Sequence, residues 1–264
     1  SGPAAVLLHG WPGDRSEYRA VVDRLPANDV VVPDLRGFGA SDRHGADPAS
    51  YGADGQARSV IGLIEELGLD RPVLAGHDIG SRVAVAVARL RPDLVGGLVL
   101  TPPLPGMGER ILGPDAAAEF WYLTFNRLPL AVELLDGRPD AVRAFLGHFW
   151  TRWAGPGFTL PAAHLDHLVA VYSAPGAAAA LLGWYRASAG ALARVTAERP
   201  PAPADRIGLP TRVLWPDLDP LFPPAWSDRL DRYFADLRVR HLTGVGHFVP
   251  MECPDEFAAA VAGR

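Results

Sequence analysis

Short β-branched or leucine-rich runs, each bounded by turn-forming residues, recur along the chain. Apolar runs of this length are typical of parallel strands that are buried on both faces of a sheet. They predict strands at Ala4 to Leu8, Val30 to Val32, Pro72 to Ala75, Gly97 to Leu100, Thr211 to Trp215 and Arg238 to Leu242.

Between these strands, other segments space their apolar residues as one face of a helix does. The longest, Tyr51 to Leu67, carries Val60, Ile61 and Ile64 on one face. Similar patterns predict helices at Ser81 to Arg91, Ala225 to Phe234 and Pro254 to Val261. Strands that alternate with helices indicate an α/β fold with a mostly parallel, doubly wound sheet.

The alternation stops between about Pro105 and Arg206, where the pattern is helical without a convincing strand. Helices are predicted there at Ala116 to Phe125, Ala141 to Trp153 and Pro175 to Ala193. Proline-rich segments at 102–106 and 200–203 flank the region as stiff hinges. We therefore predict a core of residues 1–104 and 207–264 and an inserted helical cap at 105–206. Residues 105–200 hold 12 of the 23 aromatic residues, so we expect the cap to face the sheet across an apolar cleft.

Composition and charge limit the binding partners and the cellular compartment that we expect for this protein. The 264 residues are 48% hydrophobic, and the single cysteine, Cys253, permits no internal disulfide. All 25 basic residues are arginine, the net charge is -5, and no like-charge block suggests a nucleic-acid-binding arm. No apolar run approaches the ~20 residues of a membrane helix. We expect a cytoplasmic protein, with a GC-rich bacterial coding bias, that binds neither nucleic acid nor membrane.

The pentad Gly76-His77-Asp78-Ile79-Gly80 lies directly between a predicted strand and a predicted helix. This is the place of a nucleophile elbow, the sharp turn that presents a nucleophile at the end of a strand. A carboxylate that attacks an ester only forms an anhydride, whereas attack on saturated carbon gives a stable alkyl ester for water to hydrolyse. Asp78 therefore predicts displacement at saturated carbon, as in epoxides and alkyl halides.

Two further motifs accompany the elbow. His9-Gly10-Trp11-Pro12-Gly13 follows the first predicted strand, and the segment 34–42 follows the second with the pattern D-x-R-G-x-G-x-S. Together the three motifs resemble the α/β-hydrolase family, in the group that holds epoxide hydrolases, haloalkane dehalogenases and fluoroacetate dehalogenases. The resemblance covers the chain from Ala4 onward and implies an α/β-hydrolase fold with a cap.

The resemblance also implies roles for the other site residues. The backbone N–H groups of Trp11 and Ile79 would form an oxyanion hole. His247, just past the last predicted strand, would be the general base. Asp219 would be the acid that orients it, because residues 216–220 keep the spacing and the following proline of the family's G-x-x-D-P motif. Asp217 is the alternative, and otherwise a turn-capping carboxylate.

The leaving group separates the three activities of this group. An epoxide leaves as a strongly basic alkoxide that must be protonated, and a phenol is a competent donor. Tyr185 lies in a segment that resembles the W-Y-R sequence carrying one cap tyrosine of epoxide hydrolases, and Tyr122 resembles the other. The prediction is hydrolysis of a bulky hydrophobic epoxide to a vicinal diol, without metal or cofactor. We expect apolar substrate contacts from Trp11, Trp121, Trp184 and Phe248.

Two alternatives stay open. A haloacid or haloalkane dehalogenase would share Asp78; Arg82 favours a haloacid, whereas Ile79 replaces the tryptophan with which haloalkane dehalogenases hold a halide. Arg82 could equally pair with a neighbouring carboxylate. A non-catalytic protein that only binds a hydrophobic metabolite is the third possibility. His77 is expected to orient the elbow turn rather than to transfer protons, and His9 is expected to pack within its loop.

The family implies two antiparallel strands before the His9 motif, yet only eight residues precede it here. Either that hairpin is absent or the sequence is trimmed. An exposed sheet edge could pair between subunits, so we expect a possible homodimer.

Overall fold

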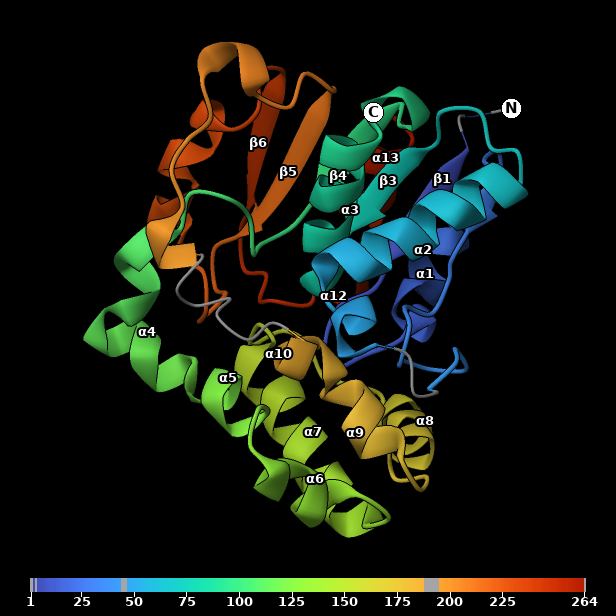
Figure 1. Ribbon diagram of the computed structural model, residues 1–264, viewed down its shortest axis with the longest axis vertical. Helices are drawn as coiled ribbons and strands as arrows, with labels where there is room; N and C mark the ends of the chain where they lie inside the picture. The colour runs from blue at the N-terminus through green and yellow to red at the C-terminus, as the bar shows by residue number, and fades with distance from the viewer. Residues whose placement is uncertain (1, 3, 44–46, 188–194, 264) are drawn as a thin grey trace.

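The computed structural model describes residues 2, 4–43, 47–187 and 195–263. In this part of the chain one fully parallel sheet has the strand order β2-β1-β3-β4-β5-β6 (Figure 1). The strands are β1 (Ala5–Leu8), β2 (Val30–Val31), β3 (Val73–Gly76), β4 (Gly97–Leu100), β5 (Thr211–Pro216) and β6 (Leu237–Leu242). The predicted strands are confirmed at all six positions.

Alternate residues of the central strands enter two separate hydrophobic clusters, one on each face of the sheet. Val6 and Leu8 of β1 belong to the cluster beneath α2 (Ala53–Glu66) and α3 (Ile79–Leu90). Ala5 and Leu7 belong to the other cluster, with residues of α13 (Pro254–Val261). Helices therefore cover both faces, which confirms the doubly wound sheet.

β6, one of the two edge strands of the described sheet, is the exception among the apolar runs. Its residues 238–241 are exposed, and Arg238 and Arg240 alternate with Val239 and His241. Charged side chains on an edge strand discourage pairing with another chain. β1, by contrast, has strands on both sides and is buried along its whole length.

The core also contains two short α-helices. α1 (Arg19–Val22) follows the 3-10 turn η1 (Arg15–Tyr18), and α12 (Val249–Glu252) precedes α13. The helix predicted at 225–234 is wrong in type, because η6 (Pro224–Arg232) is a 3-10 segment. Leu230 is its one buried residue, so packing does little to select regular α-helical spacing.

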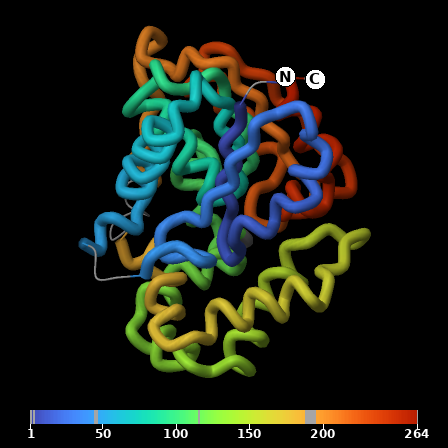
Figure 2. Tube along the Cα trace, turned by 90° about the vertical axis from the view of Figure 1, so that its right-hand side faces the viewer, coloured from blue at the N-terminus to red at the C-terminus, as the bar shows by residue number. Residues whose placement is uncertain are grey.

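Between β4 and β5 the described chain is helical and lies beyond the carboxyl ends of the strands (Figure 1). Figure 2, turned by 90°, shows the same segment as a separate layer below the core. Its helices are α4 (Pro114–Glu119), α5 (Trp121–Phe125), α6 (Pro129–Leu135), α7 (Pro139–Trp153), α8 (Ala162–Tyr172), α9 (Ala177–Leu181) and α10 (Gly183–Ala187). We propose that residues 105–206 act as the cap.

The helices in this segment differ in detail from the predicted ones. The helix predicted at 116–125 is two helices that break at Phe120, and α6 and α8 were not predicted. The helix predicted at 175–193 corresponds to α9 and α10 as far as Ala187, and the rest of it lies outside the described residues.

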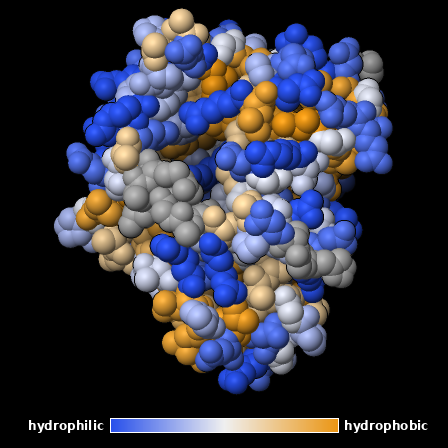
Figure 3. All heavy atoms as spheres, viewed as in Figure 1, coloured by the Kyte–Doolittle hydropathy of each residue, from blue (hydrophilic) through white to orange (hydrophobic). Residues whose placement is uncertain are grey.

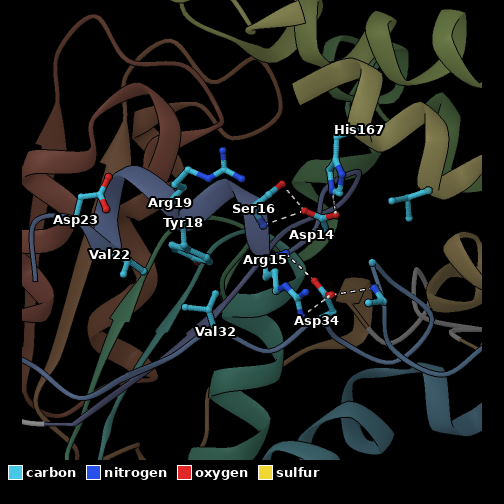
Figure 4. A pocket seen from close by; sticks show the side chains of 13 residues that line it. Asp14, Arg15, Ser16, Tyr18, Arg19, Val22, Asp23, Val32, Asp34 and His167 are labelled. Carbon is cyan, nitrogen blue, oxygen red and sulfur yellow. Dashed lines mark hydrogen bonds and ion pairs between the residues drawn. The ribbon is translucent and has the colours of Figure 1, made fainter. Parts of the chain in front are cut away.

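Hydrogen bonds join α8 to the loop that follows β1. The His167 imidazole contacts Asp14 Oδ2 at 2.6 Å, and Figure 4 shows Asp14 between His167 and Ser16. The Tyr172 hydroxyl donates to Gly13 O at 2.6 Å and accepts from Gly39 N at 3.3 Å. This loop thus contacts the cap on one side and, as described below, the candidate site on the other.

Charged side chains cover much of the visible face of the molecule, but apolar residues also reach the surface of the cap (Figure 3). Leu128, Leu130 and Leu134 are all more than two-fifths exposed. Within the described residues, no helix combines the length and apolar character that crossing a membrane requires.

Candidate active site

Asp78 occupies a sharp turn between the end of β3 and the start of α3. Its backbone has φ 50° and ψ -119°, a conformation that residues with a side chain rarely adopt. The flanking glycines allow the turn, because a Cβ at Gly80 would lie 2.0 Å from Leu8 O and one at Gly76 would lie 2.5 Å from Gly80 C. The geometry is that of a nucleophile elbow, and it presents the Asp78 carboxylate at the carboxyl edge of the sheet.

The Asp78 carboxylate is buried between the His9 motif and His247. Its Oδ1 accepts a hydrogen bond from the Trp11 N–H at 3.0 Å, and its Oδ2 lies 3.6 Å from His247 Nε2. Burial acts to raise the pKa of Asp78, but the hydrogen bond and charge of His247, with smaller contributions from His77 and the Trp11 N–H, outweigh it and hold the pKa below its ordinary value. Asp78 is therefore ionised at neutral pH.

Of the two predicted oxyanion donors, the structure brings only one to the carboxylate. Trp11 N–H donates to Asp78 Oδ1. Within the described part of the chain, Ile79 N–H donates no hydrogen bond to this carboxylate. Ile79 is the first residue of α3 and follows Asp78 directly, so its N–H lies in the unpaired first turn of that helix.

His247 is fully buried and bonded to Asp219. Its Nδ1 lies 2.8 Å from Asp219 Oδ2, and Asp219 Oδ1 also accepts from Leu221 N at 2.8 Å. Burial alone would lower the pKa of His247, but the carboxylates of Asp219 and Asp78 raise it to about 10. Asp217 instead accepts from Gly244 N at 2.8 Å and holds a turn. Asp78, His247 and Asp219 thus form one contiguous chain of groups.

The other two histidines near the elbow bond to backbone or hydroxyl groups. His9 Nε2 accepts from Leu35 N at 3.0 Å, and His77 Nδ1 lies 3.1 Å from Thr101 Oγ1. Burial, together with the charge of His247, lowers the pKa of His77 to about 3. A histidine that stays neutral at working pH is suited to packing rather than to proton transfer.

Asp78, Tyr122 and Tyr185 line the same cavity of about 110 Å³. The two tyrosine rings lie 5.8 Å apart, nearly perpendicular. Burial, and next to it the charge of Asp78, raises the pKa of Tyr122 well above the ordinary value. Burial does the same to the pKa of Tyr185, with Tyr122 and Asp78 adding to it. Both phenols are therefore protonated at neutral pH. The remaining lining is mostly apolar and includes Ile79, Met107, Ile111, Trp184 and Phe222.

Three of the four residues predicted to contact substrate lie elsewhere. Trp184 lines the cavity, but the lining does not include Trp11, Trp121 or Phe248. The Trp11 ring is covered by cap aromatics and stacks on Tyr122 at 5.5 Å. Trp121 is 43% exposed and stacks on Phe149. Phe248 stacks on Trp150 at 3.7 Å. The rings of Trp11, Trp121 and Phe248 therefore pack against other aromatic rings and do not line the cavity.

The cavity has features that sequence reasoning missed. Met107, Ile111 and Phe222 line it, and Arg127 joins Arg82 as a second arginine. A cleft of about 620 Å³ adjoins the cavity. The two share the lining residues Arg82, Pro103, Met107, Trp184 and Val195. No motif marks Met107, Ile111, Phe222 or Arg127, because these residues meet only through the packing of the cap on the core. Within the described residues, no group of three or more His, Cys, Asp or Glu side chains is placed to hold a metal ion.

Comparisons with known proteins agree with this geometry. A family model described as alpha/beta hydrolase fold matches residues 3–254. Haloalkane dehalogenase 2 of Mycobacterium tuberculosis (strain ATCC 25618 / H37Rv) is 29% identical over 276 residues, which cover 100% of this chain and 88% of that protein. Epoxide hydrolase 2 of Siraitia grosvenorii is 39% identical over 101 residues, which cover 38% of this chain and 32% of that protein.

A solved structure, epoxide hydrolase CorEH without ligand, superposes with a TM-score of 0.82 and 25% identity, covering 100% of this chain and 91% of that one. The motifs, the parallel sheet and the elbow agree with the matched family over nearly the whole chain. The chain belongs to the α/β-hydrolase fold family, among relatives named epoxide hydrolases and dehalogenases.

Proposed function

We propose that this protein hydrolyses an epoxide to a vicinal diol through a covalent ester on Asp78. One observation carries the proposal: two protonated phenols, Tyr122 and Tyr185, line the same cavity as the ionised Asp78 carboxylate. An epoxide needs a nucleophile at one ring carbon and a proton donor at the ring oxygen, and these groups supply both.

In the first step, Asp78 Oδ2 attacks one ring carbon, since Oδ1 is held by the Trp11 N–H. The bond between that carbon and the ring oxygen breaks, and the oxygen takes a proton from Tyr122 or Tyr185. The product is a neutral alkyl ester of Asp78 with a hydroxyl on the adjacent carbon.

In the second step, water attacks Asp78 Cγ while His247 takes its proton. The free enzyme holds His247 protonated, because the neighbouring carboxylates raise its pKa to about 10. Once Asp78 has become a neutral ester, one of those charges is gone, and the imidazolium gives its proton to the phenolate that the first step left. Neutral His247 can then take a proton from the attacking water. Trp11 N–H stabilises the oxyanion on Oδ1, and the diol leaves with the proton that His247 had taken. Asp78, now a carboxylic acid, returns its proton to His247, which restores the starting state.

The experiment removes the base and keeps the nucleophile. Incubation of His247→Gln with a styrene-type epoxide should leave an adduct on Asp78 of the mass of the substrate, because the ester forms but is not hydrolysed. Peptide mass spectrometry detects it. The Asp78→Asn variant should show no adduct and no diol, and an unmodified Asp78 in His247→Gln would contradict the covalent route. Equal diol formation by the wild type and Asp78→Asn would leave only a binding role.

A second candidate function is dehalogenation of a haloacid, which Arg82 favours because it lines the cavity beside Asp78. A halide leaves as a weakly basic anion and needs no proton, so this activity would not depend on the phenols. Halide release by a Tyr122→Phe, Tyr185→Phe double variant, with no diol formed from any epoxide by the wild type, would support this second function.

A further inference from the structure

Glu17, a residue with no part in the mechanism above, lies directly behind the turn that carries Trp11. Its side chain is 2% exposed. Glu17 Oε2 accepts from Gly10 N at 3.3 Å, while Oε1 has no hydrogen-bond partner among the described residues. A buried carboxyl group with one oxygen unpaired requires an explanation.

The turn at residues 10–13 is held between Glu17 and the elbow. A Cβ at Gly13 would lie 1.4 Å from Glu17 Oε1, so the carboxyl group occupies the space next to that glycine. On the opposite side, a Cβ at Gly10 would lie 2.6 Å from His77 Cδ2 and 2.9 Å from Asp78 Cβ. Gly13 N closes the turn on Gly10 O at 3.2 Å. The direction of the Trp11 N–H is therefore fixed by contacts on both sides of the turn.

We propose that Glu17 is a positioning residue that braces this turn and keeps the Trp11 N–H aimed at Asp78 Oδ1. The inference rests on the proposed covalent function. The expected charge state of Glu17 supports this role. Burial raises the pKa of Glu17 well above the ordinary value, and the nearby carboxylates of Asp14 and Asp78 raise it further, so the side chain is an uncharged acid. A second negative charge here would oppose the oxyanion that forms in the second step.

The two chemical steps depend on the Trp11 N–H in opposite ways. In the first step the N–H stabilises the carboxylate that is about to lose its charge, so a misplaced N–H does not slow attack. In the second step a new oxyanion forms on Oδ1, and a misplaced N–H slows ester hydrolysis. Bracing by Glu17 therefore acts on breakdown of the adduct and not on its formation.

The test compares Glu17→Ala and Glu17→Gln with Gln56→Ala as a matched control. Gln56 is also fully buried and bonded to loop backbone, at Arg36 N and O, but away from the elbow. Rapid-quench mass spectrometry with a styrene-type epoxide measures formation and hydrolysis of the Asp78 adduct separately in correctly folded protein.

Glu17→Ala should hydrolyse the adduct about 10- to 100-fold more slowly, with unchanged adduct formation. This is less than the loss of about 10²- to 10³-fold when an oxyanion donor is removed outright, since Trp11 remains. Glu17→Gln, a neutral acceptor of the same shape, should keep wild-type hydrolysis. Gln56→Ala should lose stability but keep both rates.

Three results would overturn the inference: unchanged hydrolysis in Glu17→Ala, equal slowing of both steps, or loss of hydrolysis in Glu17→Gln. Each of these requires a wild type that forms the adduct. A wild type that turns epoxide over without any adduct, or does not turn it over, would instead overturn the proposed function.

Discussion

The strained backbone of Asp78 brings three buried ionisable side chains into one line. Asp78 is a non-glycine residue with positive φ. Holding such a residue in this conformation costs about 1–3 kcal/mol of folding free energy, and strain of this kind is concentrated at functional sites. Here the turn directs the carboxylate toward His247, which Asp219 holds from the far side. The result is an imidazolium between two carboxylates, and its protonation is linked to the stability of the fold.

We predict that stability falls as the pH rises from 6.5 toward about 10. Below 6.5, folded and unfolded chains both hold a proton on His247, so its stabilising contribution is complete. Above it the unfolded chain loses the proton while the folded chain keeps it up to about 10, and the free energy of unfolding decreases. Melting temperatures across this range should decline less in His247→Gln than in the wild type.

The control for this prediction is His241→Gln, an exposed position on β6. It should keep the wild-type pH profile, since His241 makes no contact with Asp78 or Asp219. Parallel profiles for the wild type and His247→Gln would contradict the linkage.

Among the contacts that join α8 to the core, those of Tyr172 and His167 are of different kinds. The Tyr172 hydroxyl is buried and satisfies two backbone groups, whereas the His167 side chain is 47% exposed where it meets Asp14. A buried hydrogen bond leaves unpaired groups when one partner is removed, whereas water can replace a partner that is half-exposed, as His167 is. The Tyr172 contacts should therefore contribute more to holding α8 in place.

We predict that Tyr172→Phe lowers the free energy of unfolding by about 1–3 kcal/mol, since Gly13 O and Gly39 N stay buried without their partner. His167→Ala should lower it by at most about 1 kcal/mol. Denaturant unfolding measures both values. Tyr18→Phe is the matched control, because its hydroxyl bonds Leu8 O within the core at 2.9 Å. Hydrogen exchange in α8 should rise in Tyr172→Phe alone; a similar rise in Tyr18→Phe would show that α8 is not held by this contact.

On the scale of the whole molecule, the site has a small inner cavity of about 110 Å³ and a larger adjoining cleft of about 620 Å³. An apolar cavity of about 150 Å³ accommodates benzene, so we expect only part of a bulky hydrophobic substrate to occupy the inner cavity. The arrangement favours an epoxide whose reacting end is compact and whose remaining part extends into the cleft.

We predict that epoxides substituted on one carbon are better substrates than those with an aryl group on both carbons, by about 10-fold or more in kcat/KM. Ile111→Ala, which enlarges the inner cavity, should reduce this preference. Leu112→Ala is the control, because Leu112 is 55% exposed and does not line the cavity. Equal kcat/KM values for both substrate types in the wild type would contradict the size limit.

The sequence predicts the structure best where a short segment alone determines the backbone conformation. The buried strands follow from unbroken apolar runs such as Val6 to Leu8, and the elbow follows from the glycines around Asp78. The choice of Asp219 over Asp217 was a prediction from motif spacing, and Asp219 is the one that contacts His247.

The sequence was least informative in the cap, where helix packing decides which ring faces inward. Trp121 and Tyr122 are neighbours, yet one is exposed and the other lines the cavity. Glu17 carries no sequence signal at all, because its environment is assembled from the turn at Gly10 and Gly13. The helix α8 was missed although it supplies Tyr172.

The bond between Tyr172 and Gly13 has a consequence for how such enzymes diversify. The proposed cap is therefore not an independent lid on a constant base, since it holds the segment that carries the Trp11 amide. On the proposed mechanism, we expect that exchanging this lid for that of a relative would change the rate at which the Asp78 ester is hydrolysed, even if every catalytic side chain were retained.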